Sequence, residues 1–362
     1  MATTSIVKMT YDESERIVGC LLGTAIGDAL GLPFEGLSAS RRERMFGTVD
    51  GYRLLPGRGL VSDDTEHACM MAQCLIEAWD DCERFEQLLA KRLRWWSIML
   101  PAGIGLATLR ACGKLWLGFS PESSGVVSAG NGPAMRSPIL GALFGTEKDD
   151  LWNFVEASTR ITHRDRKAFC GAYAAAWATA WAAEQRDIAS FADALAEQLA
   201  VESEAELLLE RIRGAWRSAT AGESTPTFAA GLGMKDGVSG FIYDTVPIAI
   251  HGWMRHPEDF RSALTGVIEC GGDADSTGAL VGAITGSQVG ARGIPIALLD
   301  GIAEWPRTVS WMRNVGETLA NAITNDEPTR APRLNGGMVL GRNIAFAMIV
   351  LAHGFRRLAP PY

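Results

Sequence analysis

Two clusters of acidic and hydroxyl side chains, far apart in the chain, have the residue types that bind hard divalent cations. The first is "VSDDTEHA" at residues 61–68, where Asp63 and Asp64 are adjacent and follow Ser62. Ser62 can cap a helix that begins at Asp63, and the dipole of such a helix favours acids in its first turn. A cap accounts for one aspartate, whereas two carboxylates beside a hydroxyl also form an oxygen ligand set suited to Mg²⁺ or Mn²⁺.

The second cluster is "CGGDADSTGALVGAITG" at residues 270–286, which presents Asp273, Asp275 and Ser276 after two glycines. Glycines let the backbone turn sharply, so the alternate acids can face a common cation. A second capped helix start is the alternative interpretation. Neither cluster is accompanied by a histidine or cysteine pattern typical of zinc, so together they predict one shared, oxygen-ligated metal site.

A third motif, "GCLLGTAIGDALGLPFEG" at residues 19–36, predicts a closely packed helix followed by a functional turn. Gly19, Gly23 and Gly27 recur every four residues, and a helix with such a face packs almost backbone to backbone on its partner. Glu35 comes just after this helix, in the turn that follows Pro33. A loop carboxylate above a rigid scaffold is a candidate general acid or base, although a solvated loop glutamate is the simpler interpretation.

Two shorter motifs point to an anionic ligand. "SAGNGPAMRSPILG" at residues 128–141 places Asn131 and Gly132 before a helix that Pro133 can open, an arrangement in which free backbone N–H groups hold phosphate. "TRITHRDRKA" at residues 159–168 offers His163 from a loop between helices. For His163, a capping or surface role is the alternative to ligand contact.

The elements that position these motifs are predicted to be helices. Apolar residues recur with helical spacing in segments such as "DTEHACMMAQCLIEAWDD" and "EAELLLERIRGAWRSA", and no segment shows sustained period-two alternation. The expected fold class is therefore all-α. No composition break marks a domain boundary, so a single domain is expected, with residues 220–240 as a long surface loop.

Composition narrows the class of protein. The chain has 362 residues, of which 47% are hydrophobic and 21% charged, as in a compact folded protein. A net charge of -8 disfavours binding to nucleic acid or to an anionic membrane. Seven scattered cysteines predict buried thiols, and the first residues lack the features of a signal peptide, so a cytoplasmic protein is expected.

Taken in order, "GTAIGDALGLPFEG", "SDDTE", "GNGPAMR", "THRDRKA" and "GGDADSTG" resemble the motifs of the ADP-ribosylglycohydrolase family, typified by dinitrogenase reductase activating glycohydrolase. The resemblance implies an orthogonal multi-helix bundle with two Mg²⁺, or Mn²⁺, at the mouth of an ADP-ribose cleft. It also implies hydrolysis of the glycosidic bond that joins ADP-ribose to a modified protein side chain, arginine being the first candidate.

Residue roles follow from the same resemblance, position by position. It implies that the metals are held by Ser62, Asp63, Asp64, Asp273, Asp275 and Ser276, and Ser276 stands where many relatives have threonine. It implies that catalysis depends on Glu35, Asp63, Asp64 and Asp275. It implies that the ligand is contacted by Asp28, Asn131, Gly132, Met135 and His163.

Two departures from the family pattern affect specificity and partners. In "AGIGLAT", residues 102–108, Gly103 occupies the position where relatives often have an aspartate, which weakens the expectation of arginine specificity. Residues 1–16 form an N-terminal extension ahead of a domain at 17–362, and this extension is compatible with an immunity protein that reverses or blocks an ADP-ribosylating toxin.

Two other functions compete with this interpretation. "DADST" fits the DxDxT nucleophile motif of haloacid dehalogenase-type phosphotransferases, but that fold requires a β-strand before the motif and α/β alternation after it. A catalytically silent relative that binds ADP-ribose or blocks a toxin is the second alternative. Such a relative is expected to lose acids of the metal site, and this chain retains them.

Overall fold

The computed structural model describes residues 11–146 and 149–357. These residues are mostly helical, which confirms the all-α prediction. The described elements, in chain order, are α1 (Tyr11–Gly31), η1 (Leu32–Phe34), β1 (Leu37–Ser38), α2 (Ala39–Phe46), α3 (Asp63–Ala78), α4 (Cys82–Ser97), α5 (Leu106–Trp116), α6 (Pro121–Ser124), α7 (Gly132–Arg136), α8 (Pro138–Phe144), α9 (Asp149–Arg160), α10 (Arg166–Ala183), η2 (Ile188–Ser190), α11 (Phe191–Gln198), η3 (Ser203–Ala205), α12 (Glu206–Thr220), α13 (Thr225–Gly231), α14 (Ile242–Arg255), α15 (Phe260–Ile268), β2 (Gly271–Gly272), α16 (Ala274–Gly293), α17 (Ile296–Gly301), α18 (Val309–Thr324) and α19 (Gly336–Arg356).

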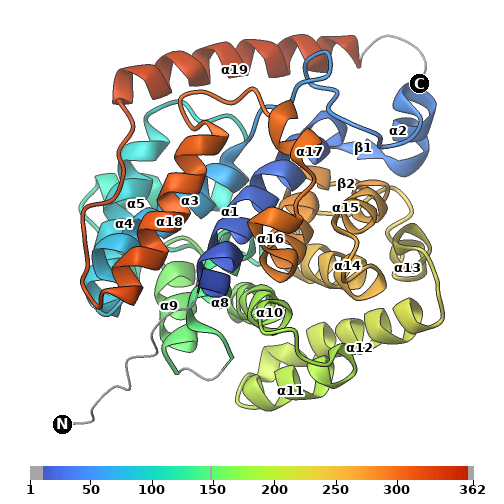
Figure 1. The fold of residues 1–362 in the computed structure, drawn as a ribbon, viewed down its shortest axis with the longest axis horizontal. Helices are drawn as coiled ribbons and strands as arrows, with labels where there is room; N and C mark the ends of the chain where they lie inside the picture. Colours follow the sequence, from blue (N-terminus) through green and yellow to red (C-terminus); the bar gives the residue numbers. More distant parts are fainter. Residues whose placement is uncertain (1–10, 147–148, 358–362) are drawn as a thin grey trace.

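Helices α1 and α16 form the centre of the molecule and touch along their backbones (Figure 1). The glycines predicted to line one face of α1 meet an equivalent row on α16. A Cβ added at Gly23 would lie 2.0 Å from the carbonyl oxygen of Gly282, and one added at Gly27 would lie 1.9 Å from that of Gly278. Because α16 begins with the second acidic cluster, this contact fixes that cluster relative to the turn that follows α1.

The remaining helices surround this pair. Helix α10 packs against α8, α14 and α16, while α3 and α18 pack on the other side of α1. Helix α3 lies against α4, α7 and α18, so the acids at its N-terminus are held by neighbours on several sides. Helix α19 lies across one face of the bundle, at the top of the view in Figure 1.

A pair of two-residue strands joins two of the predicted motifs. Strands β1 and β2 are antiparallel, with Leu37 opposite Gly272 and Ser38 opposite Gly271. Gly272 has a φ of 75°, and an added Cβ would lie 2.1 Å from the carbonyl oxygen of Val238. A side chain is excluded there by both conformation and space. The strand pair holds the turn that contains Glu35 beside the start of α16.

The structure corrects two expectations about chain organisation. Residues 11–16 are the first part of α1, which continues without a break into the core, so position 16 is not a structural boundary. Residues 1–10 lie outside the described residues. The segment 220–240 is not only a surface loop, since it contains α13 and then pairs with β2 through the backbone of Val238.

All seven cysteines are free, and all but Cys82 are buried, as predicted. In the described part of the chain, two segments are long and apolar enough to cross a membrane by length and composition alone. The window within Ser14–Phe34 is entirely buried in the core, whereas the window within Gly336–Arg356 is only 28% buried. The first is therefore a core helix, and the second is considered below.

Candidate functional site

The predicted motifs converge on one cavity of about 540 Å³, within the size range of small-molecule sites. Seven parts of the chain contribute to it: the turn after α1, the start of α3, the chain around the start of α5, the region of α7, the loop before α10, the chain before α14, and the start of α16. The sequence-predicted residues that line it are Glu35, Asp63, Asp64, Asn131, Gly132, Met135, His163, Asp273, Asp275 and Ser276.

The first acidic cluster is placed by the N-terminus of α3. Ser62 is the N-cap, and its hydroxyl accepts a hydrogen bond of 3.4 Å from the backbone N–H of Asp64, as predicted. The same hydroxyl donates to Oδ2 of Asp64 at 3.2 Å. Asp64 is buried and Asp63 is partly buried at the cavity wall. Ser62 itself lies behind the lining, where it orients Asp64.

A direct contact links the two acidic clusters. The hydroxyl of Ser276 donates to Oδ2 of Asp64 at 3.3 Å, although the two residues are more than 200 positions apart in the sequence. Asp275 is also buried, and its carboxylate accepts a bond from the backbone N–H of Ser276 at 3.0 Å. The prediction that residues near 63 and near 275 meet in space therefore holds in the structure.

The crowding of these acids raises their pKa values. Burial raises the pKa of Asp64 well above its ordinary value, and the charges of Asp28 and Asp273 raise it further. The pKa of Asp63 and that of Asp275 are raised in the same way, by burial first and by neighbouring carboxylates second. An unneutralised group of acids is thus unfavourable here, and a bound cation would remove the repulsion.

The donor set fits a hard divalent cation. Oδ1 of Asp64 is buried and has no hydrogen-bond partner, which leaves one carboxylate oxygen available to a ligand. Carboxylate and hydroxyl oxygens from both clusters line the same cavity, and these are the ligand types of Mg²⁺ and Mn²⁺. In the described residues no group of three acidic, histidine or cysteine side chains is already gathered around one point, so the ligands would have to adjust on binding.

Asp28 is placed differently from the other predicted ligand contacts. It is completely buried in α1 and does not line the cavity. Its carboxylate accepts hydrogen bonds from the backbone N–H of Ser62 at 2.8 Å and from the N–H and hydroxyl of Thr65 at 3.2 and 2.5 Å. Burial raises its pKa to about 6. The structure therefore makes Asp28 a positioning residue for the first turn of α3, and not a ligand contact.

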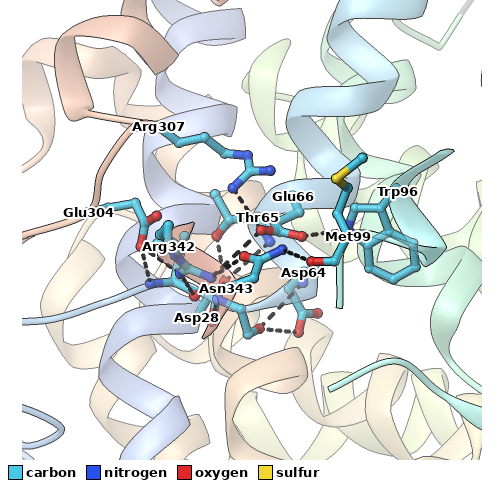
Figure 2. A network of polar contacts seen from close by, with 12 residues as sticks. Asp28, Asp64, Thr65, Glu66, Trp96, Met99, Glu304, Arg307, Arg342 and Asn343 are labelled. Atoms are coloured by element: carbon cyan, nitrogen blue, oxygen red, sulfur yellow. Dashed lines mark hydrogen bonds and ion pairs between the residues drawn. The ribbon is translucent and has the colours of Figure 1, made fainter. Parts of the chain in front are cut away.

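A second layer of charges supports α3 from behind (Figure 2). Glu66 is buried and forms an ion pair with Arg307 at 2.7 Å, and it also accepts a hydrogen bond from the indole of Trp96. Arg342 of α19 lies nearby and is paired with Glu304 at 2.6 Å. These contacts compensate the buried charges and fix a part of α3 that does not line the cavity.

Glu35 lies at the mouth of the cavity, in the turn between η1 and β1. Burial by the cleft walls and the nearby charge of Asp273 raise its pKa, while Arg357 opposes this shift. The residue is exposed toward the cleft, so water offsets part of the effect. Arg357 also donates to the carbonyl oxygens of Glu35 and Pro33, at 2.6 and 2.7 Å. The turn is thus held from the end of α19.

The opposite wall consists of the short helix α7 and His163. The amide of Asn131 donates to Oδ2 of Asp273 at 2.5 Å and to Thr245 at 3.1 Å, which ties this wall to the second acidic cluster. His163 is buried, and burial together with Arg136 lowers its pKa to about 3, so its ring is neutral. An added Cβ at Gly132 would lie 3.1 Å from that ring, so the small residue makes room for it.

Two further segments line the cavity, and sequence reasoning singled out only Gly103 among their residues. The loop before α5 and the first turn of α5 contribute residues between 103 and 108, and the chain before α14 contributes Val238 and Gly240. Both stretches contain several glycines, which are the one local signal for the other residues. Gly103 has a φ of 95°, and an added Cβ would lie 2.4 Å from Oδ1 of Asp63. A side chain at position 103 would therefore displace Asp63, so the glycine is tied to the placement of this acid.

The fold excludes the haloacid dehalogenase interpretation. Before "DADST" the chain forms only the two-residue strand β2, and after it comes the 20-residue helix α16. The parallel sheet required by that enzyme class has no counterpart in the described ranges, in which β1 and β2 make the one small sheet.

Comparisons with known proteins show the family of this chain. Residues 9–330 match the family described as ADP-ribosylglycohydrolase. An uncharacterized protein of Archaeoglobus fulgidus is 32% identical over 298 residues, covering 80% of this chain and 92% of that protein. The ADP-ribosyl-[dinitrogen reductase] glycohydrolase of Rhodospirillum rubrum is 28% identical over 301 residues, covering 79% and 90%.

A solved structure described as an ADP-ribosylglycohydrolase-related protein complex superposes with a TM-score of 0.61 at 27% identity. The match covers 86% of this chain and 99% of that one. The family match spans most of the sequence and includes both acidic clusters. The chain belongs to the ADP-ribosylglycohydrolase family.

Proposed function

We propose that the protein is a metal-dependent hydrolase that removes ADP-ribose from a modified protein side chain. One observation carries the proposal: acids from the two ends of the domain, at residues 63–64 and 273–275, meet in a single cavity with Glu35 at its mouth. Two Mg²⁺, with Mn²⁺ as the alternative, are the proposed cofactors. When bound, they supply Lewis-acid charge that orients sugar hydroxyls and water.

The proposed roles of the protein's own groups follow from their placement. Asp63, Asp64, Asp273 and Asp275 would hold the cations with the hydroxyl of Ser276, whereas Ser62, which lies behind the lining, orients Asp64 and is not a ligand. Glu35 faces the cleft and exchanges a proton with the attacking water or the leaving group. Asn131, Gly132, Met135 and neutral His163 line the wall on which the ADP-ribose lies.

Replacing Glu35 with glutamine is expected to lower hydrolysis by about 10² to 10⁴-fold, the usual range for removing a general acid or base. Glutamine keeps the shape of the side chain and lacks the titratable carboxyl group, so the affinity for ADP-ribose should change little. Single-turnover kinetics and isothermal titration calorimetry with ADP-ribose separate the two effects. Glu43→Gln on the neighbouring helix α2 is the matched control. An unchanged rate in Glu35→Gln removes this role.

The stabilisation of the fold by Mg²⁺ is expected to grow as pH rises from about 4.5 to about 7. Asp28 has a folded-state pKa of about 6 against an ordinary value of 3.8, and the pKa values of Asp63, Asp64 and Asp275 are also raised. In the metal-free protein these acids bind more protons in the folded state than in the unfolded state, so their deprotonation destabilises the fold. Buried His163, whose pKa is lowered to about 3, acts in the opposite direction, so the melting temperatures with and without Mg²⁺ are compared at each pH. A difference between them that does not grow toward pH 7 contradicts the prediction.

Arginine is the first candidate for the modified side chain, on the strength of the family resemblance. The glycine at position 103 supplies no carboxylate for a guanidinium, so a different linkage is the alternative. Incubation with arginine-, serine- and DNA-linked ADP-ribose, with and without Mg²⁺, decides between them. Binding without release of ADP-ribose in all three would favour the catalytically silent relative.

A role in immunity against an ADP-ribosylating toxin, through segment 1–16, stays a prediction, as does a cytoplasmic location. Removal of residues 1–10, which precede α1, should weaken binding to an ADP-ribosyltransferase and spare hydrolysis of a small substrate. Equal binding by the shortened protein would contradict the first role.

A further inference from the structure

Helix α19 has one face docked on the bundle and one exposed apolar face, and it lies beyond the family match, which ends at residue 330. On the docked face, Phe346 is buried in a small cluster with Leu32, Leu54 and Leu60. An exposed apolar face of several large side chains is typical of an interaction surface.

Polar bonds fix the orientation of the helix on the bundle. Arg342 donates to Glu304 at 2.6 Å and to the carbonyl oxygen of Val61 at 2.5 Å. Asn343 donates to the carbonyl oxygen of Met99 at 2.8 Å, and Nε2 of His353 lies 3.0 Å from the carbonyl oxygen of Pro33. These bonds occur along the length of α19, so the opposite face points permanently outward.

The outward face is a continuous stripe with the spacing of a helix–helix contact. Its exposed large side chains include Met348 at 67%, Leu351 at 62% and Phe355 at 70%. Steps of three and four residues connect six exposed, uncharged positions that define the stripe: Gly337, Gly341, Ile344, Met348, Leu351 and Phe355. Alternating steps of three and four are the pattern of a coiled-coil seam.

The stripe is small at one end and large at the other. Its N-terminal half contains Gly337 and Gly341, and an added Cβ at Gly341 would meet nothing within 4 Å. Its C-terminal half contains Leu351 and Phe355. An antiparallel copy of the same helix brings the large half of one against the small half of the other, whereas a parallel copy sets the two large halves against each other, and these hold the two glycine halves apart.

We propose that α19 pairs with α19 of a second copy of this chain around a two-fold axis, antiparallel. The register that matches small with large sets Gly337 against Phe355, Gly341 against Leu351, and Ile344 against Met348. Each contact then occurs twice, as in any isologous interface. At both ends of the pair, a large side chain of one copy fills the space beside a glycine of the other.

The size of the face indicates a weak dimer. A 21-residue helix is about 31 Å long and about 10 Å wide. One face of it buries a smaller area than a standard interface, which buries about 800 Å² per partner. We therefore expect a reversible equilibrium with a dissociation constant on the order of micromolar. An anionic membrane is the competing partner for this face. Gly337 and Gly341 have no side chains to bury in the lipid, so the N-terminal half of the stripe would contribute little to membrane binding.

Sedimentation velocity of the full chain, over roughly 1 to 100 μM, is the test, since this range brackets a micromolar equilibrium. The wild type should shift from monomer to dimer. Gly341→Leu fills the space reserved for Leu351 of the second copy and should stay monomeric, whereas Gly113→Leu, at an exposed helical glycine with nothing within 4 Å, should dimerise like the wild type. A monomeric wild type, or an unaffected Gly341→Leu, overturns the proposal.

A charge pair tests the register itself. Ile344→Lys and Met348→Glu should each abolish the dimer, and the double variant should restore it, because each lysine then faces a glutamate of the other copy. Matching circular dichroism spectra check that the variants are folded. A double variant that stays monomeric overturns the antiparallel register. Co-sedimentation of monomeric wild type with phosphatidylserine vesicles assigns the stripe to a membrane and also overturns the proposal.

Discussion

Replacing Asp63 or Asp275 with asparagine is expected to lower hydrolysis at least about 100-fold, because changes to groups that merely support metal ligands already cost 10 to 100-fold. Both acids line the same cavity, and Ser276, next to Asp275, bonds to Asp64. The double variant should lose little more than the worse single variant, since residues that act as one unit are not additive.

Two measurements independent of turnover accompany this prediction. Mg²⁺ should raise the melting temperature of the wild type and raise that of either variant much less. In metal-free buffer at pH 7, either variant should have a higher melting temperature than the wild type. Each asparagine removes one buried like charge and should therefore stabilise the fold. Asp259→Asn, at the N-cap of α15, removes an acid that does not line the cavity and serves as the control. Simple addition of the two activity losses, or a lack of metal by elemental analysis, argues against a shared centre.

Replacing Gly23 with alanine is expected to destabilise the fold by about 4 kcal/mol or more, the upper end for a single substitution. The new Cβ would lie 2.0 Å from the carbonyl oxygen of Gly282, which belongs to the backbone of α16 and cannot rotate away. Overpacking against backbone requires the two central helices to separate. The two acidic clusters would move apart with them, so activity and stability should fall together.

Chemical denaturation followed by circular dichroism measures this effect. Gly113→Ala is the matched control, because this helical glycine of α5 is exposed and has nothing within 4 Å of an added Cβ. It should gain up to about 1 kcal/mol from the higher helix propensity of alanine. An unchanged denaturation midpoint in Gly23→Ala is incompatible with the close contact between α1 and α16.

The features that sequence reasoning predicted are those with a local signal. The cap at Ser62 follows from a hydroxyl before two acids, and the close-packed face of α1 follows from glycines at intervals of four. The convergence of the two acidic clusters is predicted from their matching oxygen ligand types, and the family resemblance implies the same convergence.

The features that were missed depend on tertiary contacts. Asp28 looks like a loop-adjacent acid in the sequence, yet it is buried and bonded to α3. The support that Arg357 gives to the turn of Glu35 joins residues over 300 positions apart. Neither contact leaves a periodic trace in the sequence. The glycine-rich stretch near Gly240 was interpreted as a surface loop, since glycine permits both a loop and a close backbone approach.

The contact between α1 and α16 also has a consequence for biosynthesis. Helix α1 leaves the ribosome first, and its partner α16 begins about 240 residues later. At translation rates of about 5 to 20 residues per second, roughly 12 to 50 seconds pass between the synthesis of α1 and that of α16, and the glycine face of α1 has no partner in this interval. During that interval the nascent chain presents an uncovered hydrophobic helix, a substrate for chaperones. The acids at the start of α16 can reach those of α3 only after this wait, so no partly synthesised chain has an assembled cleft.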